Sequence, residues 1–184
     1  MRPKALFLDR DGVINIDHGY VFESSGIEFI PGIFELCRFA HRNGYLIIIV
    51  TNQAGIGRGY YSETDFFALM KWMCHVFEEN GAPIANVYYC PTHPTHGIGN
   101  YKMESPRRKP NPGMILDAQR DFNLDLGRSI LIGDKESDIA AGFAAGVGTT
   151  VLFSPPESNG TKHSTGATAT VQMLIDTTGY MDKR

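Results

Sequence analysis

The stretch FLDRDGVIN, residues 7–15, places Asp9 and Asp11 two positions apart, directly after an apolar run. Two carboxylates at this spacing repel one another, and removal from water strengthens the repulsion. One acidic residue is enough for an ordinary turn. The pair therefore indicates either a solvated strand end or a site where a positively charged group lies between the carboxylates.

Further polar residues follow apolar runs elsewhere in the chain. Thr51 and Asn52 end the run YLIIIVTN, and Asp134 and Asp138 lie in GDKESD, after the run SILI. Lys109 stands just before another apolar segment. Taken singly, each of these residues fits a turn, a loop or a helix cap. Together they offer several acids, one lysine and one hydroxyl, provided that the fold brings them to one place.

Hydrophobic periodicity indicates the elements that could do so. Short apolar runs predict β-strands over residues 4–9, 45–52, 86–90, 129–134 and 148–153. Apolar residues at helical spacing predict helices that follow Pro31-Gly32 and Ser62, one with Pro112 in its first turn, and one that ends at Gly146. Strands that alternate with helices predict an α/β fold: a Rossmann-like parallel sheet flanked by helices. We expect one domain over residues 1–184.

The predicted helices have recognisable ends and faces. Ser62 with Asp65 three positions later is typical of an N-terminal cap, and the apolar stripe that follows is Phe66, Leu69, Met70, Met73 and Phe77. The other apolar series are Ile33, Cys37 and Ala40, and then Met114, Leu116, Ala118 and Phe122. Residues 154–170 are rich in Ser, Thr, Gly and Pro and predict a loop, with a short last element around 171–175.

The polar residues follow predicted strands, except Lys109, which lies in the connection before a predicted helix. The ligand crevice of a parallel sheet lies at the carboxyl ends of its strands. Asp9, Asp11 and Asp134 can share one crevice only with a cation, and ligands that are all oxygen favour Mg²⁺. Lys109 and Thr51 would then supply donors for an anion brought to that metal. We therefore expect a magnesium site that binds an anionic ligand.

Composition excludes several classes of protein. The chain has 184 residues and a net charge of −3, which argues against a nucleic-acid partner. Its longest apolar run is only long enough for a strand, so we expect no membrane span. Cys37, Cys74 and Cys90 are too few and too widely spaced for a disulfide framework. We expect a cytoplasmic, monomeric protein that acts on a small molecule.

The motifs together resemble a known superfamily. The pattern D-x-D-G-V after the first strand, Thr after the second, Lys-Pro before a later helix and G-D-x-x-x-D after another strand is similar to the four motifs of the haloacid dehalogenase superfamily of phosphohydrolases. Within it, four stretches resemble the D-glycero-D-manno-heptose 1,7-bisphosphate 7-phosphatases: DRDGVINIDHGYV (9–21), TNQAGIGRG (51–59), YYCPTHP (88–94) and RKPNPGM (108–114). Those enzymes make heptose precursors of bacterial surface polysaccharides.

The resemblance implies a role for each matching residue. Asp9 would be the nucleophile that forms an aspartyl-phosphate, and Asp11 would be the general acid and then the general base. Mg²⁺ would be bound by the carboxylates of Asp9 and Asp134 and by the backbone carbonyl of Asp11. Asp138 would support the metal site indirectly. Thr51 and Lys109 would stabilise the phosphoryl oxygens.

The resemblance also implies a set of substrate-binding residues. Three of them, His18, Gly19 and Tyr20, form the flap after the first strand. The others are Asn52, Gln53 and Arg58 in the loop after the second strand, and Arg108 and Lys135 near the later motifs. Arg108 would bind a second substrate anion or, alternatively, pair with Glu104 at the surface. Neither gap between motifs is long enough for a separate cap domain. We expect the flap and the 91–108 loop alone to cover the site.

The chain departs from the family pattern at a structural zinc site. Many members have C-x-H followed by C-x-C. Here Thr92 stands at the His position, two residues after Cys90, and Ser105 and Arg107 stand at the two later Cys positions. Cys90, His93 and His96 could supply three ligands, but structural zinc takes four. We therefore expect no structural zinc, and a loop stiffened by prolines.

Three alternative functions remain. Histidinol-phosphate phosphatases share much of the framework. A polynucleotide 3′-phosphatase would require a basic groove, which the charge balance argues against. A sugar-phosphate-binding homologue without activity is less consistent with a chain in which every catalytic position is filled.

Overall fold

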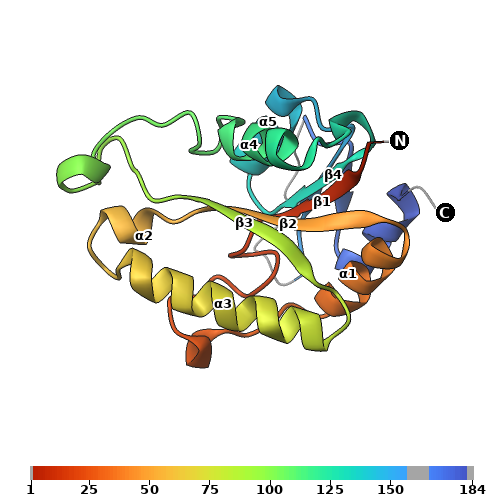
Figure 1. Cartoon of the computed structure of the whole chain (residues 1–184), viewed down its shortest axis with the longest axis horizontal. Helices are drawn as coiled ribbons and strands as arrows, with labels where there is room; N and C mark the ends of the chain where they lie inside the picture. Colours follow the sequence, from red (N-terminus) through yellow and green to blue (C-terminus); the bar gives the residue numbers. More distant parts are fainter. Residues whose placement is uncertain (1, 157–165, 182–184) are drawn as a thin grey trace.

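The computed structural model describes residues 2–156 and 166–181, and its centre is a six-stranded sheet in which all paired strands are parallel (Figure 1). The strand order is β3-β2-β1-β4-β5-β6. Their bounds are Lys4–Leu8 for β1, Tyr45–Asn52 for β2, Ile84–Cys90 for β3, Ile130–Gly133 for β4, Thr149–Phe153 for β5 and Ala169–Val171 for β6.

The chain begins in the middle of the sheet. Strands β2 and β3 are added on one side of β1, and β4, β5 and β6 on the other, so the order reverses at β1. Leu6 of β1 is paired with Ile47 of β2 and with Ile130 of β4. Ligands of open α/β sheets bind where the strand order reverses, beyond the carboxyl ends of the strands. The fold therefore directs attention to the residues that follow β1, β2 and β4.

Helices cover both faces of the sheet, as Figure 1 shows. Helices α1 (Ile33–Arg42) and α3 (Glu63–Glu79) pack on one face, and α4 (Gly113–Phe122) and α5 (Glu136–Ala145) on the other. A short helix, α2 (Ala54–Gly57), follows β2, and 3-10 helices span Ser24–Gly26, Gly99–Tyr101, Leu126–Arg128 and Leu174–Tyr180. The two helical layers leave the carboxyl edge of the sheet to loops.

The strand side chains alternate between the two helical layers. In β1, Leu6 and Leu8 belong to the core under α1 and α3, whereas Ala5 and Phe7 belong to the core under α4 and α5. This alternation is the period of two that a strand imposes. Because both faces are buried, these strands consist of continuous apolar runs.

The helix limits agree closely with the sequence patterns. Ser62 and Asp65 form a reciprocal capping box, and all the residues of the stripe that follows are buried. Helix α5 ends at Gly146, which has a left-handed φ of 81°. Two details of α4 differ from expectation: Pro112 precedes the helix, and Leu116 is 40% exposed while Ile115 is buried instead. Position 115, one residue earlier, faces the sheet.

The carboxyl-terminal region contains more structure than expected. The sequence predicted a loop to residue 170 and one short element around 171–175. The structure has strand β6 at 169–171 and a 3-10 helix over Leu174–Tyr180. Residues 157–165 of the expected loop lie outside the described residues. In the fully described stretches 9–51 and 51–109, no separate domain is inserted, as the spacing of the motifs predicted.

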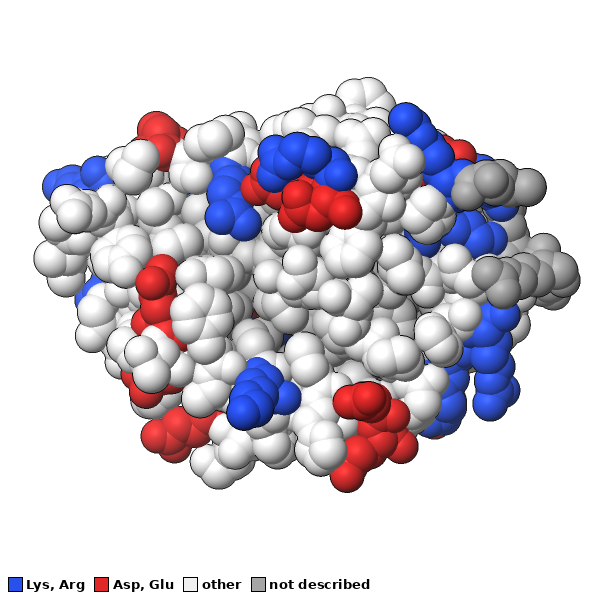
Figure 2. Space-filling view, in the orientation of Figure 1, with Lys and Arg blue, Asp and Glu red and all other residues white. Residues whose placement is uncertain are grey.

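Charges are distributed without a dominant sign on the face shown in Figure 2. Its middle is largely uncharged, and acidic and basic side chains lie around it. This face therefore carries no broad basic surface of the kind that nucleic-acid-binding proteins present. In the described part of the chain, no helix is long and apolar enough to cross a membrane.

Candidate active site

Three buried carboxylates meet at the carboxyl edge of the sheet. Asp9 follows β1, Asp134 follows β4, and Asp138 lies in the first turn of α5. One oxygen of each lies within 4.8 Å of the others, and this is the one such group of metal-ligating side chains among the described residues. The backbone N–H of Asp9 donates to the carbonyl of Ile132 at 3.1 Å, which continues the pairing of β1 with β4. Sheet geometry therefore places Asp9 beside Asp134.

Gly12 makes room for this arrangement. Its φ is +89°, and a Cβ atom built on it would lie 2.5 Å from Cγ of Asp134. Any larger residue would strain the backbone and collide with that carboxyl group. The glycine of the D-x-D-G pattern is thus required by the approach of the β4 loop.

Lys109 is the buried cation of the cluster. Its Nζ atom lies 2.9 Å from Oδ1 of Asp9 and 2.6 Å from Oδ1 of Asp138, and it donates to the carbonyl of Val50 at 2.9 Å. Asn52 holds the backbone of Lys109 through both ends of its amide, at 3.0 and 3.1 Å. These contacts fix Lys109 between the ends of β1, β2 and α5.

Electrostatics in the cluster favour a further cation. Burial raises the pKa of Asp9 to about 7; Lys109 opposes this, and Asp138 and Asp134 add to it. Burial alone would lower the pKa of Lys109, but Asp138 and Asp9 raise it, so the ammonium form is retained. Lys135 lies 3.8 Å from Asp134 and is half exposed. Three crowded carboxylates and one buried lysine fit a small divalent cation with oxygen ligands, which is the preference of Mg²⁺.

The side chain of Asp11 faces away from this cluster. It accepts a two-pronged ion pair from Arg10, with nitrogen–oxygen distances of 2.6 to 3.0 Å, and further hydrogen bonds from Asn15 and Gln53 at 3.1 and 3.3 Å. Asp9 and Asp11 therefore have different surroundings although they are two residues apart. A role for Asp11 as a side-chain metal ligand does not fit this geometry, whereas one through its backbone carbonyl stays a prediction.

Two residues expected to bind substrate use their side chains inside the protein. Gln53 is 1% exposed; its amide donates to Oγ1 of Thr51 at 2.8 Å and to Asp11, and its carbonyl accepts from Tyr61. The side chain of Asn52 is the clamp on Lys109. Both line the cleft, yet their amides position neighbouring groups.

A cleft of about 510 Å³ opens beside the carboxylates. Most residues that the sequence singled out line it: Asp9, Asp11, Gly19, Tyr20, Asn52, Gln53, Arg58, Arg108, Lys109, Lys135 and Asp138. Thr51 lies next to it through Gln53, and Asp134 lies next to it through Lys135, 3.8 Å away. The flap and the 91–108 loop both contribute to its walls, as expected for a site without a cap domain.

Two arginines give the cleft a positive wall. Arg58 lies over the ring of Tyr20, 5.6 Å from its centre, and Arg108 donates to the carbonyl of Thr92 at 3.0 Å. Within residues 2–156 and 166–181, no carboxylate lies within 4.0 Å of either guanidinium, and Glu104 does not pair with Arg108. Burial lowers the pKa of Arg108, and Arg58 lowers it further. Two neighbouring cations without carboxylate partners favour an anionic ligand.

His18 does not join the cleft. Its imidazole is 54% exposed and lies 3.4 Å from Glu28. It follows Asp17, which turns the chain by accepting from the N–H of Gly19 at 3.1 Å. The structure thus brings Gly19 and Tyr20 of the flap to the cleft, but directs the His18 ring outward.

The zinc alternative receives no geometric support. Sγ of Cys90 lies 3.3 Å from Oγ1 of Thr92. Nδ1 of His93 accepts from the backbone N–H groups of Thr95 and His96, at 3.3 and 3.1 Å. The set of Cys90, His93 and His96 is not gathered around a common point among the described side chains. The absence of zinc itself stays a prediction.

The structure adds cleft and network residues that the sequence did not predict to bind substrate. Asp17, Tyr61 and His93 line the cleft, and Asp17 also lies 3.3 Å from Nζ of Lys135. Arg10 is wholly buried behind Asp11. The one available signal was an arginine between two acids in an apolar environment. Nothing in the sequence indicates the direction of its side chain.

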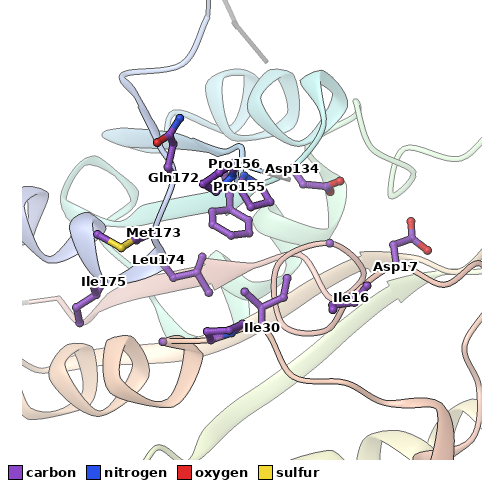
Figure 3. Close-up of a pocket in the computed structure, with 14 residues that line it drawn as sticks. Ile16, Asp17, Ile30, Asp134, Pro155, Pro156, Gln172, Met173, Leu174 and Ile175 are labelled. Carbon is purple, nitrogen blue, oxygen red and sulfur yellow. The ribbon is translucent and has the colours of Figure 1, made fainter. Parts of the chain in front are cut away.

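A second, mostly apolar cavity of about 720 Å³ adjoins the same edge of the sheet. Figure 3 shows Asp17 and Asp134 at one end, and Met173, Leu174 and Ile175 at the other. It shares Asp17 with the cleft of about 510 Å³ but contains none of that cleft's basic residues. The charge that favours an anion is therefore a feature of the smaller cleft.

Comparisons with known proteins agree with this geometry. A family model described as "HAD-hyrolase-like" matches residues 106–154. The chain is 63% identical over 181 residues to a Burkholderia mallei D-glycero-alpha-D-manno-heptose-1,7-bisphosphate 7-phosphatase, with 98% of this chain and 95% of the relative covered. It is 51% identical to the corresponding beta-named phosphatase of Vibrio cholerae, with 83% and 82% covered.

A solved structure is similar along almost its whole length. It is a D,D-heptose 1,7-bisphosphate phosphatase from B. bronchiseptica, complexed with magnesium and phosphate; the TM-score is 0.81 at 25% identity, with 96% of this chain and 97% of that chain covered. The parallel sheet, the acidic edge and these similarities lead to one conclusion: the chain belongs to the heptose 1,7-bisphosphate 7-phosphatase family of the haloacid dehalogenase superfamily.

Proposed function

We propose that this protein is a Mg²⁺-dependent phosphatase that removes the 7-phosphate of D-glycero-D-manno-heptose 1,7-bisphosphate, for the synthesis of heptose precursors of bacterial surface polysaccharides. The observation that carries the proposal is the meeting of Asp9, Lys109 and the acidic cluster beside a basic cleft wall. The names of relatives up to 63% identical support the substrate. The expected cytoplasmic location and monomeric state remain predictions.

The proposed reaction has two steps. Asp9 attacks phosphorus, the bond between phosphorus and the sugar oxygen breaks, and the proton of Asp11 passes to that oxygen. Water then attacks the aspartyl-phosphate and gives a proton to Asp11, the bond to Asp9 breaks, and inorganic phosphate leaves. Different surroundings for the two aspartates are what two different roles require.

The remaining residues position and stabilise the transferred group. A bound Mg²⁺ ion would neutralise charge on the phosphoryl oxygens, with Asp9 and Asp134 as its carboxylate ligands. Asp138 uses one oxygen for Lys109 and the other for the N–H of Lys135, which suits support of the site rather than direct metal binding. We assign Lys109 and the hydroxyl of Thr51 to the phosphoryl oxygens.

The second phosphate would lie against the arginine wall. Arg58 and Arg108 line the cleft, together with Lys135 and with Gly19 and Tyr20 of the flap. The planar fork of Arg matches phosphate oxygens, and a partly solvated contact of this kind contributes about 1–3 kcal/mol. A monophosphate such as histidinol phosphate would leave these two arginines without an anion.

We assign the α anomer as the preferred substrate. The relative with 63% identity over nearly the whole chain carries the alpha name, whereas the 51% identical relative carries the beta name. The assignment rests on this similarity, and a direct comparison of the two anomers tests it. A ratio of kcat/KM below one for α over β would contradict it.

The function is tested by phosphate release from both heptose bisphosphate anomers, fructose bisphosphate, histidinol phosphate and para-nitrophenyl phosphate. We expect Arg108→Ala to lower kcat/KM for heptose 1,7-bisphosphate by about tenfold to a hundredfold, and to leave para-nitrophenyl phosphate nearly unchanged. The matched control is Arg107→Ala, because Arg107 pairs with Asp117 at 3.1 Å and lies outside the cleft lining. Equal losses on both substrates would place Arg108 at the transferred phosphate, and no loss would favour a monophosphate substrate.

A further inference from the structure

Arg10, which separates the two catalytic aspartates in the sequence, is completely buried. Its Nε and Nη2 atoms both donate to Oδ1 of Asp11, at 3.0 and 2.7 Å, and Nη2 also lies 2.6 Å from Oδ2. The guanidinium thus contacts both oxygens of one carboxyl group. Contact with both oxygens fixes the plane of that group as well as its position.

The same guanidinium also holds the flap. Nη2 of Arg10 donates to the carbonyl of Val21 at 2.9 Å. Val21 is buried and directly follows Gly19 and Tyr20, which line the cleft. One side chain therefore connects the proposed acid to the base of the flap that covers it.

The other contacts of Asp11 cannot replace this one. Asn15 reaches only Oδ1, at 3.1 Å, and Gln53 reaches only Oδ2, at 3.3 Å. Each leaves the carboxyl group able to turn about that bond. Arg10 does not line the cleft, so it acts on the reaction only through its neighbours.

We propose that Arg10 is a positioning residue for the first chemical step: it holds the carboxyl group of Asp11 at the cleft, where its proton passes to the sugar oxygen as the phosphorus–oxygen bond breaks. The proposal rests on the acid role of Asp11 in the proposed function. Lysine keeps the charge but is a single point donor, and it cannot contact both carboxyl oxygens and Val21 in one plane.

Arg10→Lys tests the proposal with two substrates that differ in leaving group. The alkoxide of the sugar needs a proton to leave, whereas para-nitrophenolate does not, and kcat/KM reports the first step for both. We expect kcat/KM for heptose bisphosphate to fall by about tenfold to a hundredfold, the range for loss of a charge-assisted pair. For para-nitrophenyl phosphate we expect a loss below about threefold, with an unchanged inhibition constant for inorganic phosphate. Equal losses on both substrates would contradict the proposal.

A double-mutant cycle with Asp11→Asn distinguishes this inference from the proposed function. If Arg10 acts through Asp11, then Arg10→Lys causes almost no further loss on heptose bisphosphate once Asp11 is changed. If Asp11→Asn impairs both substrates equally, Asp11 is not the acid and the proposed function is wrong on that point. If Asp11→Asn impairs only the sugar substrate but Arg10→Lys still adds its full effect in the double variant, only the role of Arg10 is wrong.

A buried arginine also contributes to folding, so folding is measured in parallel by thermal unfolding. Arg10→Gln is the second variant, because its amide can donate to one carboxyl oxygen, and we expect it to show the same substrate selectivity as Arg10→Lys. Arg107→Lys is the control arginine outside the cleft lining, with neither substrate affected. Failure of both Arg10 variants to fold would assign Arg10 to structural support and contradict the proposal.

Discussion

At the residue scale, the two aspartates of one motif differ in their partners. Asp9 contacts Lys109 and lies in the carboxylate cluster, whereas Asp11 contacts Arg10, Asn15 and Gln53. The chain turns directly after β1, where the carbonyl of Arg10 accepts from the N–H groups of Val13 and Ile14, and the two side chains have different neighbours. Substitution of each should therefore fail in a different way.

We predict that Asp9→Asn lowers turnover by several orders of magnitude and weakens Mg²⁺ binding, because the change removes the attacking charge and one ligand. Asp11→Asn should lower turnover on the sugar substrate by about a hundredfold to ten-thousandfold, the range for a lost general acid. Its Mg²⁺ affinity should be unchanged, because the Asp11 side chain lies outside the cluster. Steady-state kinetics and calorimetric titration with Mg²⁺ measure both quantities. Loss of Mg²⁺ binding in Asp11→Asn would show that its carboxylate is a ligand.

A second prediction at this scale concerns Cys90. We expect purified protein to contain no stoichiometric zinc, and Cys90→Ser to unfold at nearly the same temperature. The side chain is buried, and its Sγ atom has Oγ1 of Thr92 at 3.3 Å, so a serine hydroxyl retains a partner. Elemental analysis that finds about one zinc per chain, lost in Cys90→Ser, would refute the prediction.

At the element scale, sequence patterns predicted helices and strands well where one face is buried. The stripe of α3 and its Ser62 cap follow from helical spacing and from the hydrogen-bonding capacity of short polar side chains. The series of four apolar residues predicted for α4 was wrong at Leu116, because the helix turns Met114, Ile115 and Ala118 toward the sheet and leaves position 116 exposed. Strand β6 was not predicted, since three residues are too few to show a period.

The cap of α3 gives a prediction about stability. Oγ of Ser62 accepts from the N–H of Asp65 at 3.1 Å, and Oδ2 of Asp65 accepts from the Ser62 hydroxyl and backbone N–H, at 2.7 and 2.8 Å. We expect Ser62→Ala to reduce the free energy of unfolding by about 0.5–2 kcal/mol at neutral pH. Urea denaturation measures the change.

The capping contribution should depend on pH with a definite sign. The Ser62 hydroxyl, and then its backbone N–H, lower the pKa of Asp65 below the ordinary value of an aspartate. A carboxyl group with a lowered pKa stabilises the folded state above its unfolded pKa, and this stabilisation is lost as pH falls through the folded value. The difference between wild type and Ser62→Ala should therefore narrow in acid. Ser25→Ala, at an exposed position without a capping bond, should show neither effect.

At the scale of the whole molecule, topology decides where the chemistry occurs. The alternation of strands and helices was sufficient to predict that residues after β1, β2 and β4 share one edge. The sequence could not indicate that Gln53 would contact Asp11, or that Asn52 would hold Lys109 across 57 positions, because such pairs depend on side-chain directions in the folded state. The outward direction of His18 is a further case. The sequence could therefore predict which residues lie at this edge of the sheet, but not which side chains hydrogen-bond to one another there.

The crowded carboxylates should make global stability depend on Mg²⁺. An ion that binds only the folded state stabilises it by RT ln(1 + [L]/Kd), which is about 2.7 kcal/mol at a hundred times Kd. For a chain of 184 residues, this corresponds to a rise in Tm of roughly 5–10 °C. We expect Asp134→Asn to abolish that rise, because it removes a proposed ligand, and to melt no lower than wild type in chelator, because it reduces repulsion in the cluster.

The control for this measurement is Asp176→Asn, which changes the net charge equally at an exposed position in the 3-10 helix Leu174–Tyr180. Differential scanning calorimetry with Mg²⁺ and with chelator should give the wild-type shift for that control. A shift retained in Asp134→Asn would mean that the ion binds elsewhere. A large loss of stability in chelator for Asp134→Asn would mean that Asp134 holds the loop by its own hydrogen bonds, and that repulsion among the three carboxylates is not what the cation relieves.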